Sequence, residues 1–474
     1  MSLSSSLSNA LSGLSVTSRT AQLVSSNLAN ALNEGYARRE IELGGAQGGG
    51  VFVSGINRFV DAALLSDRRN AQSSLALSSE RARVTDTLEQ VIGLPDDPYS
   101  ISAHLNQFDA SLRFLESEPN SEVRLRDTLA TASVLSRRLN ASQNHIQAER
   151  LAADRQIATG VETLNTSLQQ IAMLNERIVS ANVNGRDANT LLDERQTLID
   201  QVSELVPVRE MPRAQGAVSL VTGNGMMLIE NSAVTFEFTR TNQILPHMSI
   251  ENAQLNALEL DGEKLDLGSN TGPLSGGRLQ ALFQVRDTIA PDAQDRVDAF
   301  ALDLAGRFHD LPGDLGTVAG APGLFTDDGA RVDVSDQLGL AGRLEINALA
   351  DPAQGGNLWR LRSGMNAPSE AAAGYSSFVT DMVASLAQQS PLQGSVFDHS
   401  ASLISTASQV SSSFAQEQSF ASARYEQLDL LQMQNGVDTD AELQKLLLIE
   451  TNYAANAKVI QTIDEMLATI MRIN

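Results

Sequence analysis

Two apolar seams at opposite ends of the chain constrain the fold more than any other feature. Near the N-terminus, apolar and small residues recur in alternating steps of four and three, at Leu3, Leu7, Ala10, Leu14, Thr17, Ala21, Val24, Leu28 and Ala31. Residues 438–474 contain neither Gly nor Pro and carry a second row, at Leu446, Ile449, Tyr453, Ala457, Ile460, Ile463, Leu467 and Ile470. Because such spacing aligns side chains along one face of a helix, both ends are predicted to be long helices that pack along their seams.

Local signals indicate where these helices start and stop. Gly35 follows the last residue of the first seam, so we expect the first helix to stop there. Thr439 is followed three residues later by Glu442, which is the pattern of a capping box and predicts the start of the last helix.

The N-terminal helix is rich in serine and carries few large apolar side chains. Ordering its backbone costs conformational entropy that so little burial does not offset, and serine is an indifferent helix former. We therefore predict that both ends are frayed in the monomer and become ordered on assembly. The periodicity alone also fits an ordinary intramolecular bundle in which the two seams close on each other.

The residues between the seams alternate between helical and strand-like patterns. Helical spacing runs through residues 125–205, returns at 278–308, and returns again at 403–431. Residues 207–275 alternate like strands, and the Asp261-Gly262 pair between alternating flanks predicts a hairpin. Residues 312–368, rich in Gly, Pro and Asp, are predicted to be further β structure and loop, and the glycine-rich 44–50 a loop followed by a short strand at Val51.

These patterns predict a mixed α and β, multidomain fold, with a long α-helical bundle or coiled-coil core formed by both termini and one or more inserted β-rich outer domains. The expected division is a terminal coiled-coil axial domain of residues 1–40 and 437–474, a helical-bundle domain of residues 41–206, 276–311 and 369–436, and a β-rich outer insertion of residues 207–275 and 312–368.

Composition narrows the function classes. The chain has no cysteine, which excludes disulfide frameworks and thiolate catalysis. Its formal charge of −23 would repel nucleic acid and anionic lipid surfaces, so neither is expected as a partner. Residues 251–351 hold 18 acidic and 7 basic side chains, whereas residues 1–60 hold 3 acidic and 4 basic ones. We therefore expect the acidic middle of the chain at a solvated surface, and the nearly neutral N-terminal segment to pack against other chains.

No membrane span or cleaved leader is expected. No stretch approaches 18 consecutive apolar residues. No basic residue precedes Arg19, so a Sec-type signal peptide is not indicated, and export would use another route.

No catalytic, cofactor or metal site is expected either. The five histidines, none spaced for zinc, are His104, His145, His247, His309 and His399. The glycine-rich segment 44–50 is not followed by the Lys-Ser/Thr pair that a phosphate-binding loop needs. The segment Thr326–Gly329 lacks the spacing of acidic residues found in a calcium-binding loop, so an Asp-Gly turn is the better interpretation of it.

Motifs at both ends carry a family resemblance. Ala10–Leu14, Ser25–Ala31 and Gly35-Tyr36 resemble the N-terminal motif shared by flagellar rod, hook and hook-associated proteins, and Tyr453–Thr462 with Glu465–Leu467 resembles the matching C-terminal motif. Leu191–Asp200 is similar to a segment typical of the hook-associated protein 1 (FlgK) family of hook–filament junction proteins, and Gly276–Leu279 followed by Arg286 is similar to another.

The resemblance implies a structural subunit, not an enzyme, that forms a ring joining hook to filament outside the cell. It implies export through the flagellar type III channel and, as partners, other copies of the chain, the hook protein, a second junction protein and a cytosolic chaperone that holds the C-terminal helix. The expected assembly interface comprises Leu3, Leu7, Leu14, Val24, Leu28 and Asn30 of the first helix with Leu446, Ile449, Tyr453, Asn456, Ile460, Ile463, Leu467 and Ile470 of the last. Two alternatives stay open: another rod or hook protein, or an adhesive module carried by the β insertion.

Overall fold

The computed structural model describes residues 3–33, 35–46, 49–94, 96–316, 318–390 and 394–473. The chain divides into two compact units. The first comprises Met1–Leu75, Thr163–Val234 and Ala421–Asn474, and the second Ala76–Glu162 and Thr235–Phe420. The division falls within three helices, α2 (Ala62–Ile92), α4 (Glu122–Val183) and α11 (Val396–Gln434). The three-domain division expected from the sequence stays a prediction.

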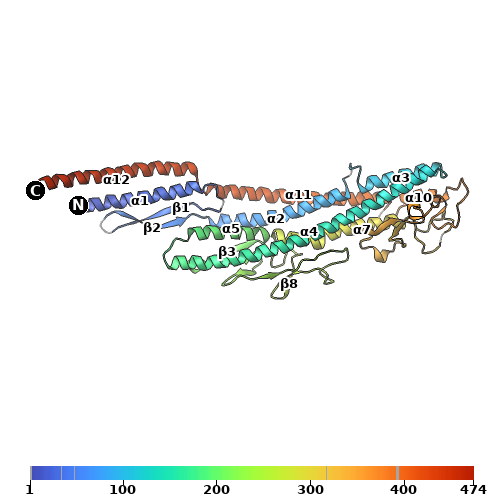
Figure 1. Ribbon diagram of the computed structural model, residues 1–474, viewed down its shortest axis with the longest axis horizontal. Helices are drawn as coiled ribbons and strands as arrows, with labels where there is room; N and C mark the ends of the chain where they lie inside the picture. The colour runs from blue at the N-terminus through green and yellow to red at the C-terminus, as the bar shows by residue number, and fades with distance from the viewer. Residues whose placement is uncertain are drawn as a thin grey trace. The chain divides into compact units, whose positions relative to one another are not determined.

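The first unit combines long helices with small antiparallel sheets. It holds α1 (Leu3–Ala29), the hairpin of β1 (Arg39–Gly45) and β2 (Val51–Arg58), α5 (Asn189–Leu205), the sheet of β3 (Val208–Pro212), β4 (Val218–Thr222) and β5 (Met227–Ile229) with the 3₁₀ turn η1 (Ala214–Gly216), and α12 (Thr439–Ile473). Within this unit α1 and α12 lie side by side, and the β1–β2 hairpin runs along α1 (Figure 1). The prediction of long terminal helices is confirmed.

The β1–β2 hairpin differs from the expected loop and single strand. Its two strands pair antiparallel from Arg39 opposite Arg58 to Gly45 opposite Val51. The backbone N–H of Val51 donates to the hydroxyl of Ser12 at 3.2 Å, and a Cβ on Gly50 would lie 2.8 Å from that hydroxyl. The glycines therefore let the hairpin approach α1 closely, a requirement that the sequence pattern alone did not reveal.

One predicted helix boundary is wrong, and the other is right with a different cap. Helix α1 ends at Ala29 and not at Gly35, where a Cβ would lie 2.5 Å from Thr197 Oγ1 of α5, so Gly35 serves a close approach and not a helix stop. Helix α12 does begin at Thr439, but its cap is Asp438, whose Oδ1 accepts the N–H groups of Asp440 and Ala441 at 2.9 and 3.0 Å. The capping box proposed for Thr439 is therefore wrong by one residue.

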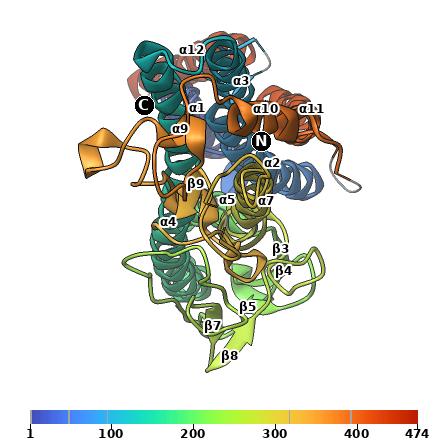
Figure 2. The ribbon, with the colours of Figure 1, turned by 90° about the vertical axis from the view of Figure 1, so that its right-hand side faces the viewer.

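The second unit is built on helices with short strands at its periphery. Its further elements are α3 (Ile101–Ser117), β6 (Phe236–Glu237), β7 (Leu258–Leu260), β8 (Glu263–Leu265), α6 (Gly277–Gln284), the π-turn η2 (Val285–Ile289), α7 (Ala290–Gly306), β9 (Phe325–Asp327), η3 (Val334–Asp336), α8 (Leu340–Arg343), β10 (Leu344–Ile346), η4 (Pro352–Gln354), α9 (Arg360–Ser363) and α10 (Ser377–Ala387). In Figure 2, β7 and β8 stand at the lower edge of the view, away from α3 and α10 of the same unit.

Two turns predicted in this unit are confirmed. Asp261 and Gly262, with φ of 52° and 81°, form the turn between β7 and β8. Asp328 and Gly329 also have positive φ, 47° and 83°, and the side chain of Asp327 pairs with Arg343 at 2.7 Å.

A buried ion pair crosses the centre of the second unit. Asp154 of α4 lies 2.7 Å from Arg286 of η2, and both side chains are fully buried. The other oxygen of Asp154 accepts the N–H of Thr241 at 2.6 Å, and Arg150 donates to the carbonyl of Arg286 at 3.0 Å. These bonds tie α4, the π-turn and the segment before β7 together. A buried charge that loses its partner is costly, so the pair is expected to hold this unit in one arrangement.

Replacing Asp154 with Asn should destabilise the second unit by about 2 kcal/mol, because the buried Arg286 would lose one of its two carboxylate partners and keep only Asp287, 2.8 Å away. Trp359, the single tryptophan of the chain, lies in the second unit, so its fluorescence during denaturant unfolding measures the effect. Asp127→Asn makes the same change at an exposed position of α4 and should shift the transition by less than about 0.5 kcal/mol. Equal shifts for the two variants would contradict a stabilising role for the pair.

Candidate assembly site of the terminal helices

The pairing of α1 with α12 is antiparallel and has a defined register. A Cβ on Gly13 would lie 3.0 Å from the side-chain amide of Asn456. Fourteen residues further along α1, the amide of Asn27 donates to Glu442 Oε2 at 3.2 Å, and Glu442 lies fourteen residues before Asn456. The two contacts therefore belong to one uninterrupted register. Glycine at position 13 leaves room for the side chain of Asn456, which would have to shift to accommodate a larger residue.

Asn27 is the hub of this pairing. Its Oδ1 accepts the hydroxyl of Tyr36 at 2.7 Å and the N–H of Arg39 at 3.2 Å. Its Nδ2 donates to the carbonyl of Arg39 at 3.0 Å as well as to Glu442, and the residue is only 1% exposed. Lys445 donates to the other oxygen of Glu442 at 2.8 Å. One side chain thus joins α1, α12 and the first strand of the hairpin.

The expected interface residues differ in how far the single chain buries them. Val24 and Ile463 are buried, and Leu3, Leu7, Leu14, Leu28, Asn30, Leu446, Ile449, Asn456 and Ile460 are half-buried. Tyr453, Leu467 and Ile470 are exposed. The structure thus brings much of the two seams together within one chain and leaves part of the C-terminal seam uncovered. The role of these residues in assembly stays a prediction.

Sequence reasoning missed several residues of this pairing. Val16 and Leu23, seven residues apart, are buried beside the predicted seam, because the hairpin covers a second side of α1. Their spacing was a signal that could have been found. Gly13 and Asn27 carried no signal in the seam, and Glu442 was assigned to a capping box, whereas each of the three contacts a partner far away in the sequence.

The outer side of α12 carries apolar side chains beyond the predicted seam. Those more than two-fifths exposed are Leu443, Leu447, Leu448, Val459, Met466 and Met471. Solvated helices normally place such residues on a covered face. These six residues, called the outer apolar face below, do not form one row: Leu443 and Leu447 lie to one side of the helix and Leu448, Val459 and Met466 to the other, with polar residues such as Thr451 between them.

Among the described residues, no helix is both long enough and apolar enough to cross a membrane.

The segment Leu191–Asp200 lies on α5 and works through its polar residues. Asp193 accepts Arg39 at 2.8 Å and Arg58 at 2.7 Å, one from each strand of the hairpin, and also the N–H of Ala37 at 3.3 Å. Asp200 accepts Arg68 at 2.6 Å and Arg69 at 2.5 Å, both from α2. Each carboxylate thus joins two arginines, and α5 holds both the hairpin and the start of α2.

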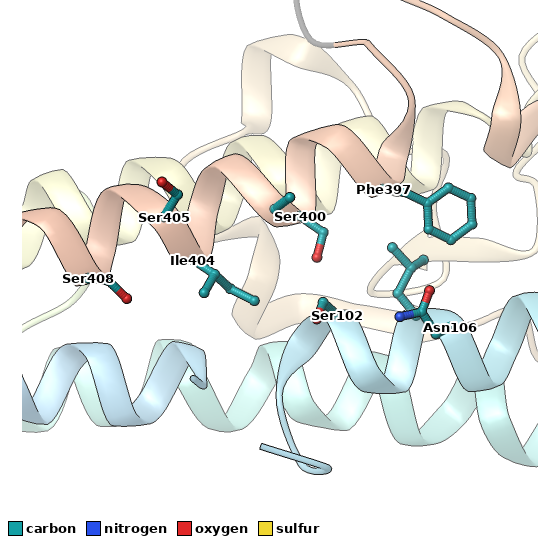
Figure 3. A pocket seen from close by; sticks show the side chains of 9 residues that line it. Ser102, Asn106, Phe397, Ser400, Ile404, Ser405 and Ser408 are labelled. Atoms are coloured by element: carbon teal, nitrogen blue, oxygen red, sulfur yellow. The ribbon is translucent and has the colours of Figure 1, made fainter. Parts of the chain in front are cut away.

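A cavity of about 500 Å³ in the second unit offers no catalytic constellation. It lies between α3 and α11, and the side chains of Ser400 and Ile404 point across it toward α3 (Figure 3). The hydroxyl of Ser400 is buried without a hydrogen-bond partner. None of the residues that line the cavity carries a titratable group, so the described part of the cavity holds no acid, base or activated nucleophile.

Comparison with known proteins decides the family. The family model described as the flagellar hook-associated protein FlgK helical domain matches residues 85–323, just over half of the chain. The chain belongs to the FlgK family of flagellar hook-associated proteins. This confirms the resemblance found in the sequence, and because the FlgK family consists of structural flagellar proteins, it also confirms that the chain is not an enzyme. A second model, the C-terminal part of flagellar basal body rod FlgEFG proteins, matches residues 434–473, which include all of α12.

Individual relatives agree with the FlgK family. Flagellar hook-associated protein 1 of Salmonella typhimurium is 28% identical over 315 residues, covering 63% of this chain and 56% of that protein. The chain thus matches little more than half the length of this relative. The Bacillus subtilis protein of the same name is 21% identical over 507 residues, covering 98% of this chain and 97% of that protein. The flagellar hook junction protein FlgK from Burkholderia pseudomallei aligns with a TM-score of 0.46 and 21% identity over 55% of this chain and 46% of that one.

Replacing Asp193 with Asn should loosen the hairpin, because Arg39 and Arg58 would lose their shared counter-charge. We expect amide exchange in residues 39–58 to quicken by about tenfold or more, a loss of at least about 1.4 kcal/mol in local stability. Hydrogen exchange with mass spectrometry measures this directly. Glu194→Gln removes a neighbouring, exposed charge of α5 and should leave the hairpin protected; if it acted as strongly, the two ion pairs would not explain the hairpin's position.

Proposed function

We propose that this chain is a structural subunit of the flagellar axis that joins hook to filament and polymerises through α1 and α12. The observation that carries the proposal is that the segment matched by the rod-type C-terminal model is helix α12, which is paired with α1 and still exposes several large apolar side chains outside that pairing. A paired helix that still exposes large apolar side chains needs a second set of neighbours to cover them. The chain supplies one set, and adjacent subunits would supply the other.

The exposed area favours such packing. Leu447 and Leu448 are 64% and 62% exposed, and burying a leucine fully contributes about 1.5–3 kcal/mol. Several such residues repeated around a ring would offset the entropy of ordering the two ends. The prediction that the ends are frayed in the monomer is compatible with this, since the intrachain pairing covers only part of both seams.

The proposed partners follow from the same role. Copies of the chain would form the ring, with the hook protein on one side and a second junction protein on the other. Before export through the flagellar type III channel, a cytosolic chaperone would cover α12. The absence of cysteine and the weakly apolar N-terminal helix support passage through a narrow channel as an unfolded chain.

Deletion of the gene should leave cells with hooks but no filaments, and with flagellin in the medium, because the filament would have no base to grow from. Electron microscopy of isolated hooks and flagellin blots of the medium test this. Purified protein added to these hooks should restore filament growth, whereas chains lacking residues 1–35 or 438–474 should not. Absence of the hook or rod in the deletion strain would instead favour a different axial protein.

The double substitution Leu447→Gln and Leu448→Gln should abolish filament growth while the monomer stays folded, because both side chains are exposed in the single chain. Complementation of the deletion strain gives the first readout, and circular dichroism of the purified monomer gives the second. Val123→Gln, at a residue of α4 that is 78% exposed, is the matched control and should complement fully. Normal filaments from the double variant would show that the outer apolar face is not used in assembly.

A further inference from the structure

A small cavity in the first unit is lined mainly by guanidinium groups. It has a volume of about 160 Å³ and lies between the start of α2, α5 and β3. Its charged lining residues are Arg58, Arg69, Arg195, Arg209 and Glu210. Four positive groups therefore surround the cavity against one negative group, in a chain whose formal charge is −23.

The nearby carboxylates do not balance this charge. Asp193 pairs with Arg58 but is shared with Arg39, which lies outside the cavity. Asp200 pairs with Arg69 but is likewise shared, with Arg68. Glu210 pairs with Arg69. Each available acid is therefore already bound to an arginine, and the cluster keeps an excess of positive charge.

Arg195 is the buried member of the cluster without a counter-ion. It is 7% exposed, and one nitrogen, Nη1, donates to Asn175 Oδ1 and to the carbonyl of Gly216, both at 2.8 Å. Its Nε and Nη2 have no acceptor among the described residues, and no carboxylate of that part of the chain lies within 4 Å. A buried guanidinium that is held on one edge and open on the other is expected to bind an anion.

The cavity contains further hydrogen-bond donors without acceptors in the described part of the chain. The side chain of Gln196 accepts from Arg58 through Oε1, while its Nε2 has no acceptor among the described residues. Ser66 also lines the cavity, and its hydroxyl has no hydrogen-bond partner among the described residues. Burial lowers the pKa of Arg195, Glu210 acts against that shift, and the charges of Arg58 and Arg69 add to it, so the cavity repels further positive charge.

The size of the cavity selects the anion. Liquid water takes about 30 Å³ per molecule, so 160 Å³ has room for a tetrahedral oxyanion of five heavy atoms. Residues with donor groups line it from α2, α5 and β3, and a tetrahedral oxyanion has enough acceptor oxygens for several of them. The negative charge of the whole chain does not prevent binding, because charges beyond about 10 Å are screened at physiological salt.

We propose that the cavity between α2, α5 and β3 binds an inorganic tetrahedral oxyanion, phosphate or sulfate, through Arg195, Arg209, Gln196 and Ser66. The bound anion supplies the counter-charge that Arg195 lacks and joins three elements of the first unit. This property concerns the single chain and does not depend on assembly into the flagellum.

Titration calorimetry of the full chain with sodium phosphate, at constant ionic strength set with chloride, tests the proposal. We expect saturable binding of phosphate and sulfate, and slower amide exchange in residues 208–222 when phosphate is bound. Arg209→Gln, at an exposed residue whose side chain has no described partner, should fold normally and weaken binding by about tenfold, or about 1.4 kcal/mol. Arg195→Gln should abolish binding, but its bonds to Asn175 and Gly216 make Arg209 the cleaner variant.

Arg186→Gln is the matched control, since it removes one exposed positive charge of the first unit away from the cavity. Its phosphate affinity should equal that of the unsubstituted chain. Three results would each overturn the proposal: no saturable binding at phosphate concentrations up to tens of millimolar, equal weakening by Arg186→Gln and Arg209→Gln, or tighter binding of acetate than of phosphate. The last result would identify a carboxylate, such as a side chain of another subunit, as the occupant.

Discussion

The antiparallel contact between α1 and α12 is the interaction on which the rest of the first unit depends. An apolar seam by itself specifies a face but tolerates sliding by a whole heptad. The buried bond between Asn27 and Glu442 removes that freedom, because any slip would leave both groups desolvated and unpaired. Since Asn27 also binds the backbone of Arg39, the same register positions the hairpin.

Two carboxylates of α5, each shared by two arginines, hold the hairpin and α2 in place. Asp193 holds both strands of the hairpin, and Asp200 holds two neighbouring arginines of α2. Partly buried charges are costly to separate from their partners, so these pairs restrict the angle at which each element leaves α5. The polar residues of α5 thus determine how the hairpin and α2 are oriented, while its apolar residues contribute the buried apolar surface.

The sequence predicted those elements whose causes are local. The terminal helices follow from repeats within each segment, and the hairpin turn at Asp261 from the conformational preference of an Asp-Gly pair. The hairpin of β1 and β2, in contrast, depends on close approach to α1, and the role of Asn27 depends on a residue 415 positions away. The two partners of such a contact are too far apart in the sequence to belong to one repeat pattern. The contacts of Asn27 and of the hairpin could therefore not be predicted from periodicity.

The separation of α1 from α12 along the chain also affects the order of folding. Helix α1 is made first, and its partner begins only at Thr439. During synthesis the nascent N-terminal helix therefore has no complementary surface, and closing a loop of that length is slow compared with forming local helices. The terminal pair can therefore form only after α12 is available, whereas the contacts of the inner helices do not require it.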